Sequence, residues 1–292
     1  MRYRLQHRTR FSYATMVTSS RQRLHLMPRA FERQQVHNAR IEVSPEPTDR
    51  EQQLDYFGNS VLDIAVRSEH RILEIISDAT VDVLPRQHIL LDLSPSWESV
   101  AENLQKPTTA AMWEASKFCF PSPQIDVEGV VPFAQINFSA NKPLLRATME
   151  LTDRIYREFE YKGGVTDVAT PVTTVMKTRK GVCQDFAHLA IASLRSLGLP
   201  ARYVSGYLLT HPAEGQQRLI GADASHAWLS VWCPEFGWVD FDPTNNLLPG
   251  EEHITIAWGR DYADVAPTIG VIHGGGRQKL SVEVTVQELA SA

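Results

Sequence analysis

One cysteine of this sequence stands where a helix is expected to begin. After Cys183, apolar residues recur at spacings of three and four, a pattern typical of a helix with one buried face; they are Phe186, Leu189, Ala190, Leu194 and Leu197. Gly198 and Pro200 follow as a stop signal. The N–H groups of a first helical turn lack intrahelical partners and carry partial positive charge. Both effects favour a thiolate, so Cys183 is predicted to be a nucleophile.

A predicted β-hairpin supplies a base and a carboxylate for this thiolate. Two strand-like runs within residues 225–244 flank a turn near Pro234. If the turn is centred there, His226 lies opposite Asp242, and the Cβ atoms of such cross-strand partners are about 5 Å apart. The carboxylate would bind one imidazole nitrogen and leave the other for the thiol. A register slip of two residues would make Asp240 the partner instead, and the sequence leaves the register open.

These residue types are the ones that acyl transfer needs. Cys183 would attack a carbonyl carbon, His226 would give a proton to the leaving amine, and Asp242 would orient the imidazole. Backbone N–H groups at the helix start, including that of Cys183, would stabilise the oxyanion. The sequence identifies no side-chain donor for the oxyanion.

Other cysteines and histidines are weaker candidates. His188 lies five residues after Cys183, roughly 140° further around the same helix, so we expect it to be structural. A zinc site is disfavoured because no close pair has zinc-ligand spacing; its ligands would be Cys183, His188, His226 and Cys233. Cys119 lies between two phenylalanines and is expected to be a small buried hydrophobe.

Composition excludes several classes of protein. The chain has 292 residues, 43% hydrophobic and 22% charged, as expected for one large or two medium globular domains. Its net charge of −5 disfavours nucleic acid or an anionic membrane as the main partner. No apolar run approaches the roughly 20 residues of a membrane span, and the N-terminus lacks the apolar segment of a signal peptide. With three cysteines and no disulfide framework, we expect a reducing, cytoplasmic setting.

The elements that must position the candidate site fall into three predicted units. Residues 1–93 alternate like strands and predict a small antiparallel β domain. Residues 94–141, interrupted by five prolines, are interpreted as a mixed connector. Residues 142–292 are predicted to form the catalytic core. This core would start with an amphipathic helix at 144–159 and end with a closing strand at 280–286, after a glycine-rich turn.

Several blocks of the chain resemble the transglutaminase-like superfamily, in particular its bacterial members with an N-terminal β domain. The blocks are GVCQDFAH at 181–188, GLPARYVSGY at 198–207, HAW at 226–228, GWVDFDPT at 237–244 and GRDYADVAP at 259–267. The resemblance implies an α+β, papain-like core in which the cysteine helix packs against an antiparallel sheet. In that family the aspartate of the Asp-Pro-Thr block completes the triad, which corresponds to Asp242 rather than Asp240.

The resemblance also implies acyl transfer through a thioester, to water or to an amine. The chain has no acidic cluster resembling the calcium sites of the animal enzymes, so we expect no metal and no other cofactor. We therefore expect a cysteine hydrolase that cuts a peptide or isopeptide bond in a protein or peptide substrate. The alternatives are a transglutaminase with an amine acceptor and a protein-binding module without turnover. The sequence gives no oligomeric state.

Overall fold

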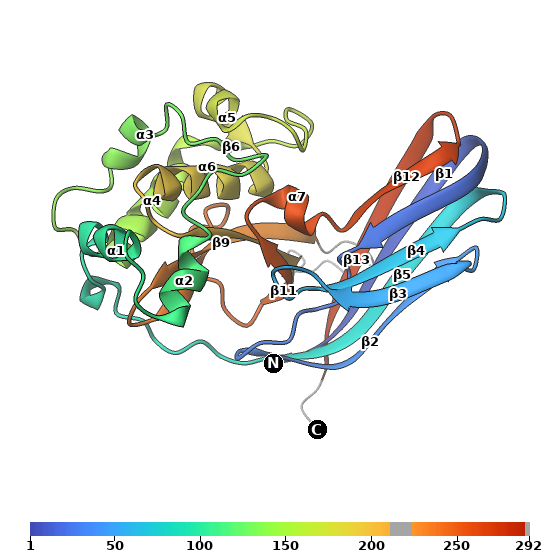
Figure 1. The fold of residues 1–292 in the computed structure, drawn as a ribbon, viewed down its shortest axis with the longest axis horizontal. Helices are drawn as coiled ribbons and strands as arrows, with labels where there is room; N and C mark the ends of the chain where they lie inside the picture. Colours follow the sequence, from blue (N-terminus) through green and yellow to red (C-terminus); the bar gives the residue numbers. More distant parts are fainter. Residues whose placement is uncertain (211–223, 290–292) are drawn as a thin grey trace, which may run out of the picture.

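The computed structural model describes residues 1–210 and 224–289, and it combines a β-rich part with an α+β part (Figure 1). The β-rich part is one seven-stranded sheet in which all the pairings are antiparallel. In the α+β part, helices pack against a smaller four-stranded antiparallel sheet. The predicted fold class, α+β with an N-terminal β domain, is confirmed.

Strand β1 is the centre of the larger sheet. Its first half pairs with β5 on one side and β13 on the other, and its second half pairs with β4 and β12. The register with β5 shifts between Ser12 and Val17, where β1 passes from one set of partners to the other. The strands are β1 (Arg2–Leu24), β2 (Gln34–Ser44), β3 (Asp49–Leu54), β4 (Ser60–Val66), β5 (His70–Val83), β12 (Thr268–Gly274) and β13 (Gln278–Leu289).

The C-terminal strands differ from the sequence prediction. The closing strand forms as part of β13, but it pairs with β1, where Val286 lies opposite Leu5, and not with the four-stranded sheet. The prediction that residues 142–292 form a core closed by its own last strand is therefore corrected. An alternating pattern shows that a strand has a buried face but does not identify its partner. The boundaries near residues 93 and 141 stay predictions.

The smaller sheet has the strand order β10-β9-β8-β11. Helix α6 packs on β9 and β8, and α3, α4 and α5 pack on α6 in turn. The elements are α1 (Trp97–Leu104), α2 (Ala110–Ser116), α3 (Val131–Gln135), α4 (Leu144–Glu158), β6 (Glu160–Tyr161), α5 (Val172–Thr178), β7 (Lys180–Gly181), α6 (Cys183–Ser196), β8 (Ala201–Leu208), β9 (Ala224–Cys233), β10 (Gly237–Phe241), β11 (His253–Gly259) and α7 (Tyr262–Val265), with a 3₁₀ turn at Leu91–Leu93.

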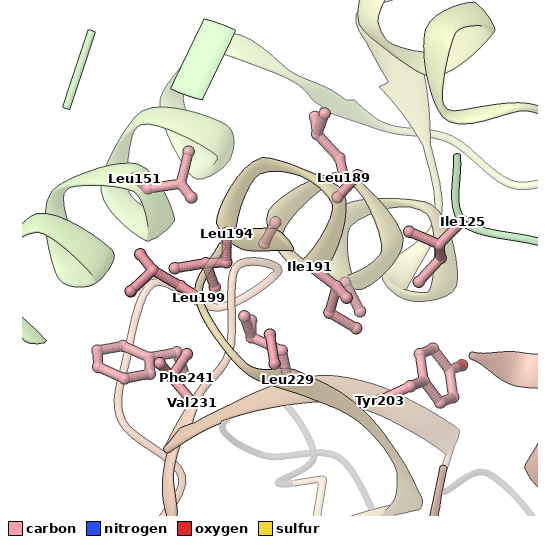
Figure 2. Packing of buried hydrophobic residues seen from close by; sticks show 14 of the residues in the cluster. Ile125, Leu151, Leu189, Ile191, Leu194, Leu199, Tyr203, Leu229, Val231 and Phe241 are labelled. Atoms are coloured by element: carbon pink, nitrogen blue, oxygen red, sulfur yellow. The ribbon is translucent and has the colours of Figure 1, made fainter. Parts of the chain in front are cut away.

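Helix α6 is buried on nearly all sides after its first turn. Residues 185–195 are all buried, and Figure 2 shows Ile191 above Leu229 of the sheet, with Leu151 of α4 to the left of the helix. Each fully buried leucine or isoleucine contributes about 1.5–3 kcal/mol relative to an exposed one. This packing holds α6 in place and thereby fixes the position of Cys183 at its start.

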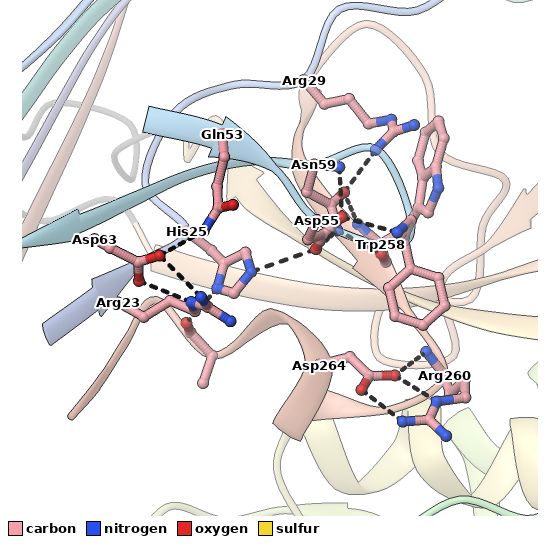
Figure 3. A network of polar contacts seen from close by, with 12 residues as sticks. Arg23, His25, Arg29, Gln53, Asp55, Asn59, Asp63, Trp258, Arg260 and Asp264 are labelled. Carbon is pink, nitrogen blue, oxygen red and sulfur yellow. Dashed lines mark hydrogen bonds and ion pairs between the residues drawn. The ribbon is translucent and has the colours of Figure 1, made fainter. Parts of the chain in front are cut away.

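Two side chains of the β-rich part, Gln34 at the start of β2 and Asn59 just before β4, complete the hydrogen bonding of β11, an edge strand of the smaller sheet. The Asn59 side chain donates to the Trp258 carbonyl at 2.8 Å and accepts its N–H at 3.0 Å (Figure 3). Gln34 makes the same pair of bonds with Thr255, at 2.7 and 2.9 Å. Each side-chain amide thus makes the pair of hydrogen bonds that a neighbouring strand would make. The guanidinium of Arg29 also packs over the Trp258 ring, 3.7 Å from its centroid. These contacts fix β11 relative to the N-terminal sheet.

Replacing Asn59 by leucine is expected to lower the free energy of unfolding by about 2 kcal/mol, because the Trp258 N–H and carbonyl both lose their partner. Urea unfolding followed by tryptophan fluorescence measures this change. Asn38, which is exposed on β2, is the matched control. The same substitution there should change stability by less than about 0.5 kcal/mol, and equal effects at both sites would contradict the role of Asn59.

Candidate active site

The residues on either side of Cys183 provide the hydrogen bonds and the close packing with which α6 begins. The Asp185 carboxylate turns back to accept the Val182 N–H at 2.8 Å and the Thr166 hydroxyl at 2.7 Å. A Cβ at Gly181 would lie 2.8 Å from the Asp185 Cβ, so only glycine fits there. Burial raises the pKa of the Asp185 carboxyl above its ordinary value. The Gly-x-Cys-x-Asp spacing is thus a helix N-cap, and it leaves the half-buried Cys183 at the first helical position.

The hairpin register differs from the predicted one by two residues. Asp240 pairs with Ser230 and Phe241 with Leu229, around a three-residue turn closed by Gly237 in the left-handed region at φ 65°. Asp242 therefore does not lie directly opposite His226. The two residues still share one face of the hairpin as diagonal neighbours, a separation that an imidazole spans. His226 Nε2 lies 2.7 Å from Asp242 Oδ2, so the predicted partner is correct although the predicted pairing was wrong.

Asp242 is fully buried and accepts hydrogen bonds on both oxygens. Oδ1 accepts the backbone N–H groups of Thr244 and Asn245 at 2.9 and 3.2 Å. Oδ2 accepts His226 Nε2 at 2.7 Å, the Asn245 side-chain amide at 2.7 Å and His253 Nε2 at 3.1 Å. Burial alone would raise the pKa of Asp242, but the donors outweigh it and hold this pKa well below its ordinary value. The carboxylate stays ionised in the interior.

His226 responds to this fixed negative charge. Burial favours the neutral ring, but the hydrogen bond to Asp242 and the interaction with Cys183 outweigh burial and raise the pKa of His226 from 6.5 to about 10. Because Nε2 is bound to Asp242, Nδ1 is the ring nitrogen available to the thiol. At neutral pH the His226 ring is therefore a positively charged imidazolium that interacts with Cys183.

The other residues considered from the sequence lie outside this group. His188 is buried beside Tyr203 and accepts the Tyr262 N–H at 3.2 Å, and burial lowers its pKa to about 4. Its position agrees with the predicted structural role. The Asp240 carboxylate faces Arg33 at 3.4 Å instead of a histidine. Cys119 is half-buried, and burial raises its pKa to about 11, which disfavours the reactive form.

Sequence reasoning missed two residues of the site, His253 and Asn245. Asn245 directly follows the Asp-Pro-Thr block, so its turn position was a usable signal. His253 lies eleven residues after Asp242 on an edge strand, and nothing near it in the sequence indicates where its ring points.

A metal site is the alternative reading of the two histidines and the carboxylate. The possible ligand atoms of His226, Asp242 and His253 lie within 4.8 Å of one another. They form the one group of three possible metal ligands in the part of the chain that the structure describes. Both rings, however, already donate to the same oxygen. The Asn245 amide nitrogen lies 2.7 Å from that oxygen and 3.3 Å from His226 Nε2, where it adds a donor and no ligand. The arrangement fits a hydrogen-bonded carboxylate better than a cation site.

The fold and the geometry place this chain in the class of α+β proteins that set a helix-borne cysteine beside a histidine and an aspartate of an antiparallel sheet. Residues 134–243 match the transglutaminase-like superfamily, and residues 3–82 match the bacterial transglutaminase-like N-terminal region. The chain belongs to the transglutaminase-like superfamily.

Its similarity to mycobacterial proteins extends over nearly the whole chain. The Mycobacterium tuberculosis protein Rv2569c is 40% identical over 98% of this chain and 91% of its own length. The Mycobacterium leprae protein ML0607 is 32% identical over 99% of both chains. A Pseudomonas aeruginosa protein named protein-glutamine gamma-glutamyltransferase is 40% identical over 74 residues, which are 25% of this chain and 11% of that protein.

Among solved structures, a protein from Cytophaga hutchinsonii described as a candidate cysteine protease has the same fold. Its TM-score is 0.76 with 22% identity, and the match covers 100% of this chain and 92% of the other. Within residues 1–210 and 224–289, no helix is both long and apolar enough to cross a membrane.

Replacing Asp242 by asparagine is expected to lower the pKa of His226 from about 10 toward 6.5, because the fixed negative charge is lost. The imidazolium would then deprotonate at a lower pH. NMR titration of ¹³C-labelled histidine measures this directly, with His226→Gln used to assign the signal. Asp240→Asn, two residues earlier and on β10, should leave the titration unchanged. A shift equal to that of Asp242→Asn would refute the assignment.

Proposed function

We propose that this protein is a cysteine-dependent acyl-transfer enzyme that hydrolyses a peptide or isopeptide bond. The Cys183 thiolate attacks the carbonyl carbon, and the backbone N–H groups at the start of α6 stabilise the oxyanion. His226 donates its proton to the leaving amine nitrogen as the C–N bond breaks, which leaves the acyl group on Cys183 as a thioester. The observation that carries the proposal is the 2.7 Å bond between His226 and the buried Asp242.

The second half of the reaction restores the starting state. His226, now neutral, takes a proton from a water molecule while the water oxygen attacks the carbonyl carbon of the thioester. The C–S bond then breaks, the acid product leaves and Cys183 returns as a thiolate beside an imidazolium. No metal or cofactor is needed for these steps. The proposal includes a protein or peptide substrate and a reducing, cytoplasmic compartment, in which the three cysteines stay free thiols.

Transfer to an amine is the second candidate. The observation that favours it is the 40% identity over 74 residues to a Pseudomonas aeruginosa protein named protein-glutamine gamma-glutamyltransferase. The same thioester serves both reactions, and only the second nucleophile differs. Hydrolysis is preferred because water is always present at the site, whereas an amine needs a place to bind.

Mass spectrometry of a peptide mixture, with and without a primary amine, tests the proposal. We expect cleavage products with the wild type, and replacing Cys183 by alanine should reduce their rate by about ten-thousand-fold. Cys119→Ala is the matched control, since it removes a half-buried thiol elsewhere. Amine incorporation without cleavage would favour the transglutaminase. No covalent change by folded wild-type protein would favour a binding module.

The pH dependence of turnover provides a separate test of the acid role. Since His226 must be protonated to release the amine, kcat/KM should fall as pH rises through about 10 in the wild type. In Asp242→Asn the fall should begin at a lower pH, because the pKa of His226 is lower. An alkaline limb that is identical in the two proteins would contradict the assignment of His226 as the acid.

A further inference from the structure

We propose that His253 is a positioning residue for the reaction: it acts as a second imidazole donor that fixes the Asp242 carboxylate for His226. This inference rests on the proposed function. His253 Nε2 lies 3.1 Å from Asp242 Oδ2, the oxygen that also accepts His226 Nε2 at 2.7 Å. The centroids of the two rings are 6.0 Å apart, and both rings donate to this one oxygen.

His253 reaches Asp242 from the opposite edge of the sheet. It lies on β11 and Asp242 follows β10, so β8 and β9 separate them. Gly206 of β8, which pairs with His226, leaves room between them because it has no side chain. A Cβ at Gly206 would lie 2.5 Å from the Trp228 ring and 2.2 Å from the Ile254 carbonyl oxygen. The Trp228 ring occupies this space and meets His253 edge-on, with centroids 5.2 Å apart.

The chemistry at the two nitrogens of His253 differs. Nε2 is bound to Asp242, whereas Nδ1 is buried and has no hydrogen-bond partner among residues 1–210 and 224–289. A buried polar atom without a partner costs about 1–3 kcal/mol, so the ring is a poor choice for packing alone. A leucine would fill the same space without that cost. The benefit of histidine lies in its one satisfied nitrogen, which contacts the carboxylate.

The position of His253 is fixed by the N-terminal sheet. Two and five residues further along β11, Thr255 and Trp258 are held by the Gln34 and Asn59 amides. These bonds stop β11 from sliding, which would move the His253 ring away from Asp242. The side chains that donate to Asp242 Oδ2 are His226, His253 and the exposed Asn245, whose amide can be replaced by solvent more easily than a buried ring, while the Thr244 and Asn245 N–H groups bind Oδ1.

The test compares His253→Leu with His253→Gln. Glutamine places an amide N–H near the position of Nε2 and retains the donor, whereas leucine removes it. A hydrogen bond to a charged group is worth about 1.5–3 kcal/mol, so kcat should fall about 10- to 100-fold in His253→Leu, with KM nearly unchanged. His253→Gln should recover most of this loss. The His226 titration should also move to lower pH in the leucine variant and return in the glutamine variant.

His70 offers a matched control outside the site. It is 5% exposed, one nitrogen bonds the Ser68 carbonyl at 2.8 Å, and the other is buried without a partner in the part of the chain that the structure describes. It also meets an aromatic ring, Tyr13, with centroids 5.9 Å apart. His70→Leu should change the melting temperature as much as His253→Leu, but it should leave kcat and the His226 titration unchanged.

Two results would overturn the inference. If His253→Leu changes only the melting temperature, as His70→Leu does, His253 is merely structural. If the His226 titration moves to higher pH, His253 competes for Asp242 and does not position it. Because the titration needs no substrate, it decides the role of His253 even if wild-type protein catalyses no acyl transfer. A wild type without turnover would refute the proposed function alone.

Discussion

The buried charge of Asp242 is the constraint on which the rest of this structure depends. An ionised carboxylate in a protein interior costs several kcal/mol unless donors surround it. Here donors come from β9, from the turn after β10 and from β11, so one side chain determines how these elements meet. In return, the negative charge raises the pKa of His226 and keeps a proton beside Cys183. The hydrogen bonds that stabilise the buried carboxylate are therefore the same ones that the proposed reaction needs.

The two parts of the chain are less separate than their compositions imply. The chain leaves the larger sheet after β5, forms the whole α+β part, and returns to the same sheet as β12 and β13. The α+β part is therefore inserted between strands of one sheet, with both connections anchored on β1 or its neighbour. This topology gives the β-rich part a physical role, which is to hold β11 of the smaller sheet in place.

A buried cation–π stack strengthens the same junction. The guanidinium of Arg202 packs 4.3 Å from the Trp238 ring centroid and 3.7 Å from that of Trp258, while Arg29 packs over Trp258 as well. Burial lowers the pKa of Arg202 to about 9, which reflects how little solvent reaches it. Trp238 lies on the β9–β10 hairpin and Arg29 precedes β2, so the stack links this hairpin, β8, β11 and the N-terminal part.

The sequence by itself determined the local features: the buried helix, its Gly-x-Cys-x-Asp start, the hairpin with His226 and Asp242, and the α+β class. These follow from periodicity and capping, which act over a few residues. Only the tertiary structure decided the hairpin register, the pairing of β13 with β1, and the convergence of His253 on Asp242. Each depends on which surfaces meet across distant segments, and burial, unlike periodicity, is a property of the assembled chain.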